Sequence, residues 1–414
     1  MKKLYTLCAI CALALPALAE EAPAPAPAEN QTITQTQITA ETQAPQPAAL
    51  PAEPQKPKLK VSPSGRILVD AAAYTSNEKK DFPAGVAIPD ARIGVKASYG
   101  KWSAKVDIGF GYGKVSLKDI FIQHTFNPSN LIRFGYFVHQ FGLQSATSSS
   151  MKISMEEPTS NEIFNYPRLL GAMYVFDHGQ FFATASLHAE SKAMTLRSNA
   201  MGKTGYGGMT RLVWRPVTTG GNIAAVGFSF AAGSAQYNDE KDLNHKAYAI
   251  SANFPTRVAQ VNALGVTVDN IKAMTKFTPE LLLAHNNLAL ESQYYWFNLS
   301  RHDGLPAYTA YGAYALLRWL PVGGNYKYSH ADAGIATPGP KSLELVLGYN
   351  YTNASSNKAK LYGGRLNDVS LTANWYLNKY MIWRLRLAYT HRWDKTGAPD
   401  TNLGAIQTRF QISF

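Results

Sequence analysis

The chain has 414 residues, of which 16% are charged and 12% are aromatic, and its formal net charge is +12 at pH 7. An α-helical membrane protein is excluded, because no apolar run in the mature part reaches the ~18 residues that a spanning helix needs. The basic balance does not indicate nucleic-acid binding either, since Lys and Arg are dispersed singly along the chain and form no helical cluster.

Residues 1–19 have the pattern of a secretory signal peptide. Two lysines precede an apolar core, and Ala-Leu-Ala at residues 17–19 forms a small-x-small cleavage site. A lipoprotein signal is the competing interpretation, but Leu and Ile precede Cys8 and Cys11 where a small residue is expected. These are the only cysteines, so the mature chain would contain no disulfide. Loss of the two lysines would lower the net charge from +12 to +10.

Residues 20–60 are rich in Ala, Pro, Gln, Glu and Thr and have almost no large apolar side chain. Such a segment cannot bury enough surface to offset the entropy lost on ordering. We therefore predict a disordered periplasmic tail, partly polyproline-like. A tether to the cell wall or to a partner is the functional alternative.

Residues 61–414 are predicted to form a single β-barrel domain, because charged and apolar residues alternate with a period of two. In residues 90–99, Arg92 and Lys96 alternate with apolar residues, and Lys105 continues the pattern after a turn at residues 100–101. In the next predicted strand, residues 114–126, Asp119 breaks the phase and indicates a β-bulge. A soluble β-sandwich would also alternate, but its strands are shorter and would not need so many exposed rings.

The alternation stops over residues 138–167, where Ser, Thr, Met, Glu and Pro dominate. A connection of about thirty residues is much longer than usual and indicates a functional loop. We expect it to fold into the barrel and narrow the bore, although a loop over the outer mouth would have the same composition. The residues expected at the constriction are His139, Gln140, Lys152, Glu156 and Glu157.

Alternation then resumes and continues to the end of the chain. The remaining predicted strands are residues 168–176, 180–189, 206–216, 222–234, 245–254, 275–285, 288–301, 308–320, 342–351, 365–377, 380–393 and 404–414. With the strands before the loop the total is seventeen, whereas a barrel with both ends in the periplasm needs an even number. Either residues 257–268 hide a further strand, which gives eighteen, or one assignment fails, which leaves sixteen.

The last eleven residues, GAIQTRFQISF, show the alternation most clearly. Ile406, Phe410 and Phe414 lie on one face of the predicted strand, and Gln407 and Arg409 lie on the other. An apolar face that ends in a carboxyl-terminal aromatic residue is typical of a strand with lipid on one side and a wet lumen on the other.

With the apolar face turned to lipid, the strands direct more basic than acidic side chains into the lumen. A positive lumen with low-dielectric walls concentrates anions, and guanidinium groups can pass an oxyanion between neighbours. Charges that only solvate a watery interior and pair with acids are the alternative. The basic residues expected along the anion path are Arg92, Lys96, Lys105, Lys118, Arg133, Arg211, Arg318, Arg384, Arg386 and Arg392.

No sequence motif indicates an enzyme, a cofactor or a metal site. Gly202-Lys203-Thr204 lacks the upstream glycine of a phosphate-binding loop, and the nine histidines include no pair with metal-ligand spacing. A barrel hydrolase would need a Ser and a His together on the outer rim, and no nucleophile-elbow pattern supports one. A structural barrel that anchors the envelope through its tail is the other alternative.

Several stretches resemble the phosphate-selective porin O/P family, and their order along the chain gives the resemblance its weight. They are GRILVDAAAY (65–74), ARIGVKASYGKWSAKVDIGFGYGKVSLKDIFIQH (91–124), IRFGYFVHQFGL (132–143), LESQYYWFNLSR (290–301), GGRLNDVSLTANWYLNKYMIWRLRLAYTHRW (363–393) and the terminal Phe414. The resemblance covers essentially the whole chain after the tail.

The resemblance implies a homotrimer of barrels, usually sixteen-stranded, that passes phosphate through a basic lumen. Arg168 matches an arginine that opens the sixth strand in the family, and Arg92 matches the last residue of an Arg-Arg-Ala-Arg pattern. The constriction loop departs from the family, because Glu157 stands where a Met-Glu-Arg pattern has arginine. We thus expect a passive porin for small hydrophilic anions such as phosphate. It would lie in the outer membrane of a Gram-negative bacterium, in contact with lipid and lipopolysaccharide.

Overall fold

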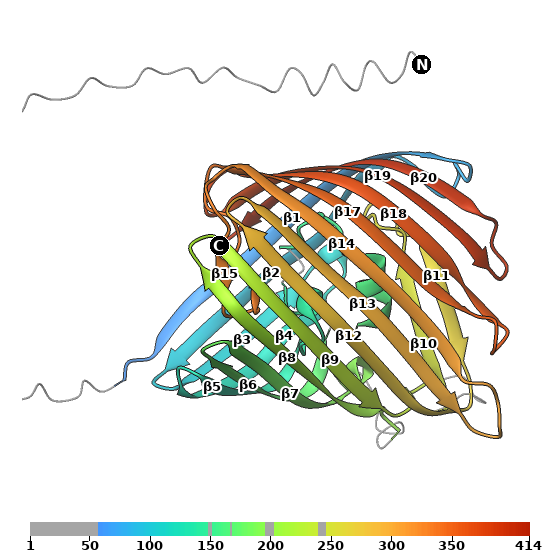
Figure 1. Ribbon diagram of the computed structural model, residues 1–414, viewed down its shortest axis with the longest axis horizontal. Coiled ribbons are helices and arrows are strands. Elements are labelled where there is room, and N and C mark those ends of the chain that lie inside the picture. The colour runs from blue at the N-terminus through green and yellow to red at the C-terminus, as the bar shows by residue number, and fades with distance from the viewer. Residues whose placement is uncertain (1–56, 148–150, 166–167, 195–202, 239–245) are drawn as a thin grey trace, which may run out of the picture. The chain divides into compact units, whose positions relative to one another are not determined.

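A computed structural model gives the architecture of most of the chain (Figure 1). The described residues are 57–147, 151–165, 168–194, 203–238 and 246–414. The predicted signal peptide, and all but the last four residues of the predicted tail, lie outside them. Within the described part, no helix is both long and apolar enough to cross a membrane.

Sixteen of the described strands form a closed barrel in which every neighbouring pair is antiparallel, which confirms the predicted fold. In order around the wall they are β1 (Lys60–Ser76), β2 (Gly85–Tyr99), β3 (Trp102–Gly109), β4 (Ser116–Asn127), β5 (Asn130–Phe137), β6 (Leu169–His178), β7 (Phe181–Ala189), β8 (Tyr206–Thr219), β9 (Asn222–Gly233), β12 (Ile271–His285), β13 (Leu288–Arg301), β14 (Tyr308–Val322), β17 (Ser342–Ser356), β18 (Leu361–Tyr376), β19 (Met381–Lys395) and β20 (Thr401–Ser413). Strand β20 pairs with β1 and closes the ring.

The other described elements lie outside the wall sheet and are short. Two small antiparallel sheets are formed by β10 with β11 and by β15 with β16. These elements are α2 (Leu143–Ala146), α3 (Thr159–Phe164), β10 (Tyr248–Asn253), β11 (Asn262–Val268), β15 (Tyr328–Ser329), β16 (Gly334–Ile335) and the 3₁₀ turns η1 (Gly111–Gly113) and η2 (Ser191–Met194).

The strand number is therefore sixteen, and the alternative of eighteen is wrong. Residues 245–254, predicted as a wall strand, contain β10, and residues 257–268 contain β11. Both alternate as expected, but they pair with each other and not with the wall. The bulge predicted near Asp119 is confirmed, because the register between β3 and β4 shifts between Val106 and Ile108.

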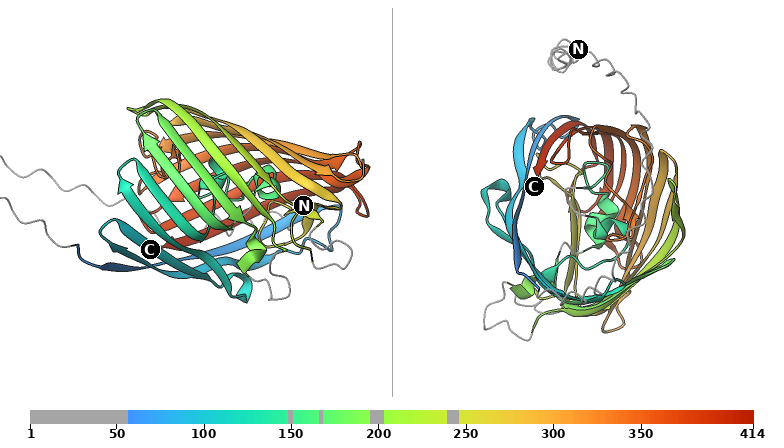
Figure 2. Two further views of the ribbon diagram at one scale, coloured as in Figure 1. Left: turned by 90° about the horizontal axis from the view of Figure 1, so that it is seen from below. Right: turned by 90° about the vertical axis from the view of Figure 1, so that its left-hand side faces the viewer.

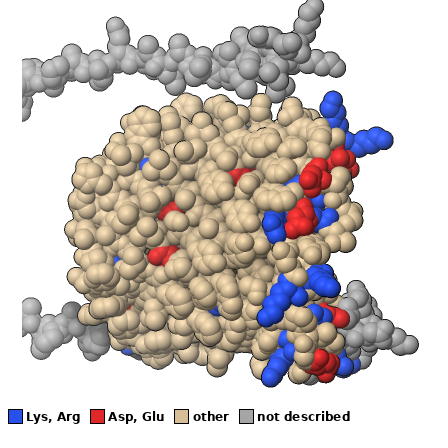
Figure 3. Space-filling model, turned by 45° about the vertical axis from the view of Figure 1, so that its right-hand side comes forward, with Lys and Arg blue, Asp and Glu red and all other residues tan. Residues whose placement is uncertain are grey.

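The wall strands present apolar side chains outward and polar ones inward. On β18, Val369 and Leu371 are 47% and 50% exposed on the outer surface, whereas Ser370 and Thr372 are buried inside. Figure 3 shows the consequence, since the outer surface is largely free of charge except toward one end. A sheet with this sorting is suited to lipid outside and water inside.

The closing strand is sorted as its sequence predicts. Gln407, Arg409 and Gln411 are buried inside the barrel, while Ile406 and Ile412 are exposed outside. Phe414 is bonded to β1, with 3.0 Å between its carbonyl oxygen and the backbone nitrogen of Gly65. The carboxyl-terminal aromatic residue therefore completes the ladder that closes the barrel.

The two ends of the barrel differ in their connections. We call the end at which β1 begins and β20 ends the terminal end, and the other the far end. Tight turns join most strands at the terminal end, such as Gly220-Gly221, whose positive φ angles of 64° and 82° suit a two-residue hairpin turn. Longer loops occupy the far end, and some segments enter the bore, where Figure 2 shows helices inside the ring of strands.

Strand length also varies around the barrel. On one side, β3 and β5 have only eight residues each, whereas β17 and β18 on the other side have fifteen and sixteen. The wall is therefore shorter along the barrel axis around β3 to β7 than around β12 to β20, and we call the part around β3 to β7 the low side.

Candidate functional site

The constriction loop, residues 138–167, packs against one half of the inner wall, as far as it is described. At its start, the backbone nitrogen of Gln144 in α2 donates to Oε1 of Gln293 on β13 at 2.9 Å. Toward its end, the hydroxyl of Ser160 in α3 donates to Oδ1 of Asn350 on β17 at 2.6 Å. Polar side chains that point inward from the long strands thus hold the two ends of the loop.

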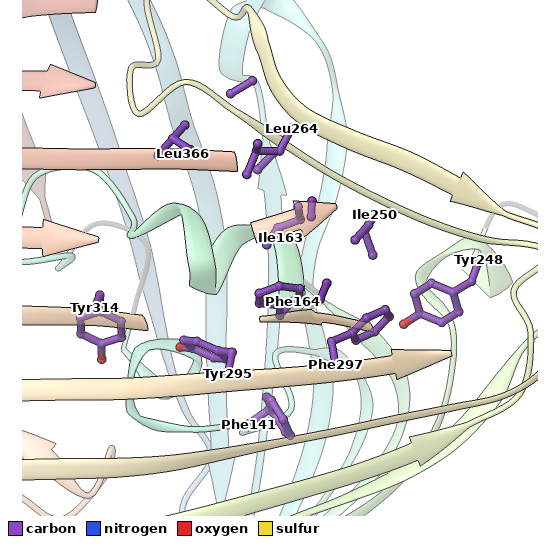
Figure 4. Packing of buried hydrophobic residues seen from close by; sticks show 14 of the residues in the cluster. Phe141, Ile163, Phe164, Tyr248, Ile250, Leu264, Tyr295, Phe297, Tyr314 and Leu366 are labelled. Atoms are coloured by element: carbon purple, nitrogen blue, oxygen red, sulfur yellow. The ribbon is translucent and has the colours of Figure 1, made fainter. Parts of the chain in front are cut away.

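Apolar packing reinforces these bonds. Ile163 and Phe164 of α3 lie among Tyr295, Phe297 and Leu366 of the wall, together with side chains of β10 and β11 (Figure 4). This cluster is buried inside the barrel, although alternation alone predicts a polar interior. The constriction loop is therefore fixed to the wall by a small hydrophobic core of its own.

Arginines of the last two strands form hydrogen bonds and ion pairs with the middle of the constriction loop. Arg409 on β20 donates to the carbonyl oxygen of Met155 at 2.6 Å and forms ion pairs with Glu156 at 2.9 Å and with Asp70 of β1 at 2.6 Å. Arg384 on β19 donates to the carbonyl oxygen of Lys152. These guanidinium groups serve as anchors for the loop.

A second segment reaches across the bore, and we call it the crossing hairpin: β10, β11 and the turn at residues 254–261. The carbonyl oxygen of Pro255 in this turn accepts bonds of 3.0 Å from Arg386 on β19 and from Gln407 on β20. Arg257 of the turn lies 3.2 Å from the carboxylate of Glu156 in an ion pair. The crossing hairpin is thus bonded both to the wall and to the constriction loop.

A third segment enters from the terminal end, and we call it the mouth segment, residues 323–341, which contains β15 and β16. Arg211 on β8 donates to the carbonyl oxygen of Asp332 at 2.8 Å, and the Arg215 guanidinium lies 5.3 Å from the ring of Tyr328. The hydroxyl of Tyr326 donates to Glu344 at 3.0 Å. The segment therefore lies against the inner wall from β8 to β17.

The space that remains open lies toward the short strands. A cavity of about 1290 Å³ extends from turns at the terminal end, such as residues 128–130, to residues 248–251 of the crossing hairpin. The constriction loop lines one side of it, and β1 to β6 line the other. The basic residues that line this second side are Arg66, Arg92, Lys96, Lys105, Arg133 and Arg168.

These six residues, together with the neighbouring Lys118 on β4, form what we call the basic wall. Its described ion pairs involve only three carboxylates. They are Arg66 and Arg92 with Asp90 at 2.5 and 2.8 Å, Lys105 with Asp107 and Asp119 at 2.6 and 3.1 Å, and Arg168 with Asp119 at 2.8 Å. Seven cations against three carboxylates leave an excess of four positive charges. Such an excess within low-dielectric walls attracts anions into the cavity.

The constriction loop does not balance this excess with negative charge. Glu157 lines the cavity 3.5 Å from Lys152 in an ion pair, and burial raises the pKa of Glu162, which also lines the cavity, to about 8. His139 at the start of the loop does not add positive charge, because burial lowers the pKa of its imidazole to about 3. The two sides of the cavity therefore differ in charge, and the positive side is the basic wall.

The structure divides most of the residues predicted along the anion path into two groups. Arg92, Lys96, Lys105, Arg133 and Arg168 line the cavity, and Lys118 lies beside them. Four others point inward but lie behind the inserted segments and outside the cavity lining. These are Arg211, Arg384, Arg386 and Arg392.

Arg318 lines the cavity but is buried in an ion pair with Glu344 at 2.7 Å. Among the predicted constriction residues, Gln140, Lys152 and Glu157 line the cavity, whereas His139 and Glu156 are buried behind it.

Two features of the site are missing from the sequence-based prediction. The alternation pattern places β10 of the crossing hairpin in the wall and does not decide whether the residues around Arg257 and β11 form a further wall strand. The mouth segment received no role, although the interval of more than twenty residues between the strands ending at 320 and starting at 342 is far longer than a hairpin turn. That interval is the signal that could have revealed it.

Comparisons with known proteins agree with this architecture. Residues 61–414 match the family model described as phosphate-selective porin O and P. The fold is similar to the trimer form of OmpT, an outer membrane protein of Vibrio cholerae, with a TM-score of 0.53 and 12% identity over 85% of this chain and 99% of that one. No match was found among curated protein sequences.

Two further solved structures share the fold. An anion-selective porin from Comamonas acidovorans has a TM-score of 0.53 and 12% identity, over 86% of this chain and 100% of that one. The outer membrane channel DcaP of Acinetobacter baumannii has a TM-score of 0.51 and 10% identity, over 86% of this chain and 97% of that one.

Proposed function

The chain belongs to the phosphate-selective porin O and P family, and we propose that it passes small hydrophilic solutes passively with a preference for anions. It is an outer-membrane β-barrel of a Gram-negative bacterium, and its family is one of channels and not of enzymes. The excess of positive charge on the basic wall carries the proposal. An anion at the basic wall would meet seven cations and the three carboxylates paired with them, and the low-dielectric barrel would strengthen the attraction. Asp177 of β6 also lines this side of the cavity, but it is paired with Arg215.

Phosphate is a suitable solute for the same surface. Arg168 lines the cavity and pairs with Asp119 through its Nε, and guanidinium groups bind oxyanions through paired hydrogen bonds. Lys96 and Lys118 have no carboxylate within ion-pair distance among the described residues, so their charge is available to a passing anion. The carboxylates already paired with the basic wall, Asp90, Asp107 and Asp119, would compete with an anion and limit how tightly it is held, as release requires.

Proteoliposomes test the proposal through uptake of phosphate compared with tetramethylammonium, a cation. Phosphate should enter faster, and the double variant Lys96→Gln, Lys118→Gln should reduce the difference several-fold, because no carboxylate loses its partner. Lys272→Gln is the matched control, since Lys272 is an exposed lysine of β12 outside the cavity lining. Equal entry of the two ions would contradict the proposal.

The lengths of the connections support one orientation in the membrane. Barrels of the outer membrane have short periplasmic turns and longer external loops. The terminal end, with its two-residue turns, would then face the periplasm, and residues 20–60 would lie there. The far end carries most of the charge visible in Figure 3 and would meet lipopolysaccharide phosphates. Lys358 and Lys360, between β17 and β18 at this end, are exposed.

A homotrimer would cover the low side of the barrel. An eight-residue strand at about 3.3 Å per residue and a 45° tilt spans about 19 Å, less than the apolar band of about 25 Å in such barrels. Apolar side chains such as Ile122 and Phe134 are exposed on this outer face. A neighbouring copy would bury them and complete the apolar surface, and OmpT, which shares the fold, has a trimer form.

A further inference from the structure

Apolar side chains line the cavity beside the basic wall, where alternation predicts polar ones. On the wall, Phe121 of β4, Leu131 of β5 and Val175 of β6 point inward and are only half-buried. On the constriction loop, Val138 and Met151 line the cavity and are half-buried as well. A passage for inorganic ions alone has no need of these groups, since exposed apolar surface repels hydrated ions.

A cation lies within this apolar surface. The guanidinium of Arg133 stacks on the ring of Phe121, with 4.2 Å between its central carbon and the ring centroid, and it lies 5.3 Å from the centroid of Phe137. The two rings pack edge to face at 5.9 Å. The guanidinium of Arg133 therefore lies over aromatic surface and also lines the cavity.

The charge of Arg133 is not neutralised by an acid among the described residues. Its Nε and Nη2 donate to Oε1 of Gln123 at 3.1 and 2.8 Å, and this amide is uncharged. No described carboxylate lies within ion-pair distance of Arg133. An incoming carboxylate could thus pair with this guanidinium without displacing an internal carboxylate.

The apolar residues and Arg133 are neighbours in the sheet register. Arg133 pairs with Gln123 across to β4 and with Met173 across to β6, and Leu131 pairs with Val175. Phe121 is two residues from Gln123 on the same inward face. A small anion bound at Arg133 would therefore have Phe121 on one side and Leu131 and Val175 on the other.

We propose that this surface makes the channel favour anions that carry a compact apolar group, such as aryl carboxylates, over equally charged anions without one. The inference rests on the proposed anion preference and names the solute class. The carboxylate would pair with Arg133, while the ring would lie on the apolar surface at one side of it, such as Phe121, and remove apolar surface from water. Covering one ring corresponds to about a tenfold gain in occupancy over acetate.

Bi-ionic planar-bilayer recordings with potassium benzoate on one side and potassium acetate on the other test this at pH 8, with protein-free bilayers as the blank. Benzoate diffuses more slowly than acetate in water, so an unselective pore gives a permeability ratio below one. The expected result is a ratio above one, together with block of chloride current by benzoate at about a tenfold lower concentration than by acetate. A ratio at or below that of free diffusion, without block, would overturn the inference.

Variants separate the contributions. Phe121→Ala and Arg133→Gln should each bring the two half-blocking concentrations close together. Phe134→Ala is the matched control, because Phe134 lies on the same pair of strands but is exposed on the outer surface. If Phe121→Ala fails to insert, Arg133→Gln and the wild-type ratio still decide.

The outcome is distinguishable from failure of the proposed function. If the channel prefers chloride over potassium but its benzoate-to-acetate permeability ratio equals that of free diffusion, this inference alone is refuted. A channel that prefers potassium would refute the anion preference itself.

Discussion

Arginine has two roles inside this barrel. Arg384 and Arg409 hold the constriction loop through its backbone carbonyls and through Glu156, and they are fully buried. Arg92 and Arg133 belong to the basic wall and line the cavity. All four obey the same alternation rule, so the sequence predicts that they point inward. It does not reveal which of them contact an inserted loop and which line open space.

The anchoring role predicts a strong effect of Arg409→Gln. The change leaves the buried carboxylates of Asp70 and Glu156 without their shared cation, which costs about 3–5 kcal/mol. We expect a lower free energy of unfolding in urea and a larger, noisier single-channel conductance, because the constriction loop is released.

Arg392→Gln is the control for this prediction. Arg392 is also an inward arginine. It bonds to the neutral hydroxyl of Thr401 at 2.7 Å and lies 5.8 Å from the ring centroid of Phe254 in the crossing hairpin, and no described bond joins it to the constriction loop. Its substitution should change the conductance much less than Arg409→Gln, because the constriction loop keeps its anchors. Equal conductance in both variants and the wild type would show that Arg409 does not anchor the loop.

At the scale of elements, the wall could be predicted from the sequence and the contents of the bore only in part. The alternation located the wall strands, and the break over residues 138–167 located the constriction loop. The crossing hairpin could not be placed, because β10 and β11 alternate as wall strands do and periodicity does not tell which sheet a strand joins. Their mutual pairing removes them from the wall and leaves sixteen strands.

Shortening the crossing hairpin tests its contribution to the constriction. Asn253 and Asn262 are cross-strand partners, so residues 254–261 can be replaced by Asn-Gly, which forms a two-residue hairpin turn. We expect a higher single-channel conductance, because the turn that reaches β1, β19 and β20 is removed while β10 and β11 remain.

The matched control replaces residues 357–360 by the same Asn-Gly turn between Ser356 and Leu361, which are also cross-strand partners. This loop joins β17 and β18 at the far end and does not line the cavity. Its conductance should equal that of the wild type. A hairpin variant that also matches the wild type would show that the turn does not limit the current.

At the scale of the molecule, the barrel is asymmetric in height and in content. The inserted segments fill the side of the long strands, and the cavity lies along the short strands, whose outer face carries exposed apolar residues. The sequence predicts strands but not this asymmetry, because strand ends blur into loops in the alternation pattern. The asymmetry is the physical argument for association through the low side.

A pair of outward substitutions tests the trimer. Ile122→Arg places a charge on the low side, and Leu371→Arg places one on the long-strand side, where the exposed fractions of the two native residues are 46% and 50%. Both carry a similar lipid cost of about 2–4 kcal/mol. We expect Ile122→Arg to give monomers and Leu371→Arg to remain trimeric, as measured by light scattering in detergent. Dissociation in both or in neither would contradict the proposed interface.

The zero-current potential of the wild-type channel in a tenfold gradient of potassium chloride tests the central claim most directly, since its sign reports which ion the cavity favours. The excess of positive charge on the basic wall predicts a potential of the sign set by chloride, shrinking at high salt as the charges are screened. A zero-current potential with the opposite sign, which means that potassium permeates more readily than chloride, would contradict the account.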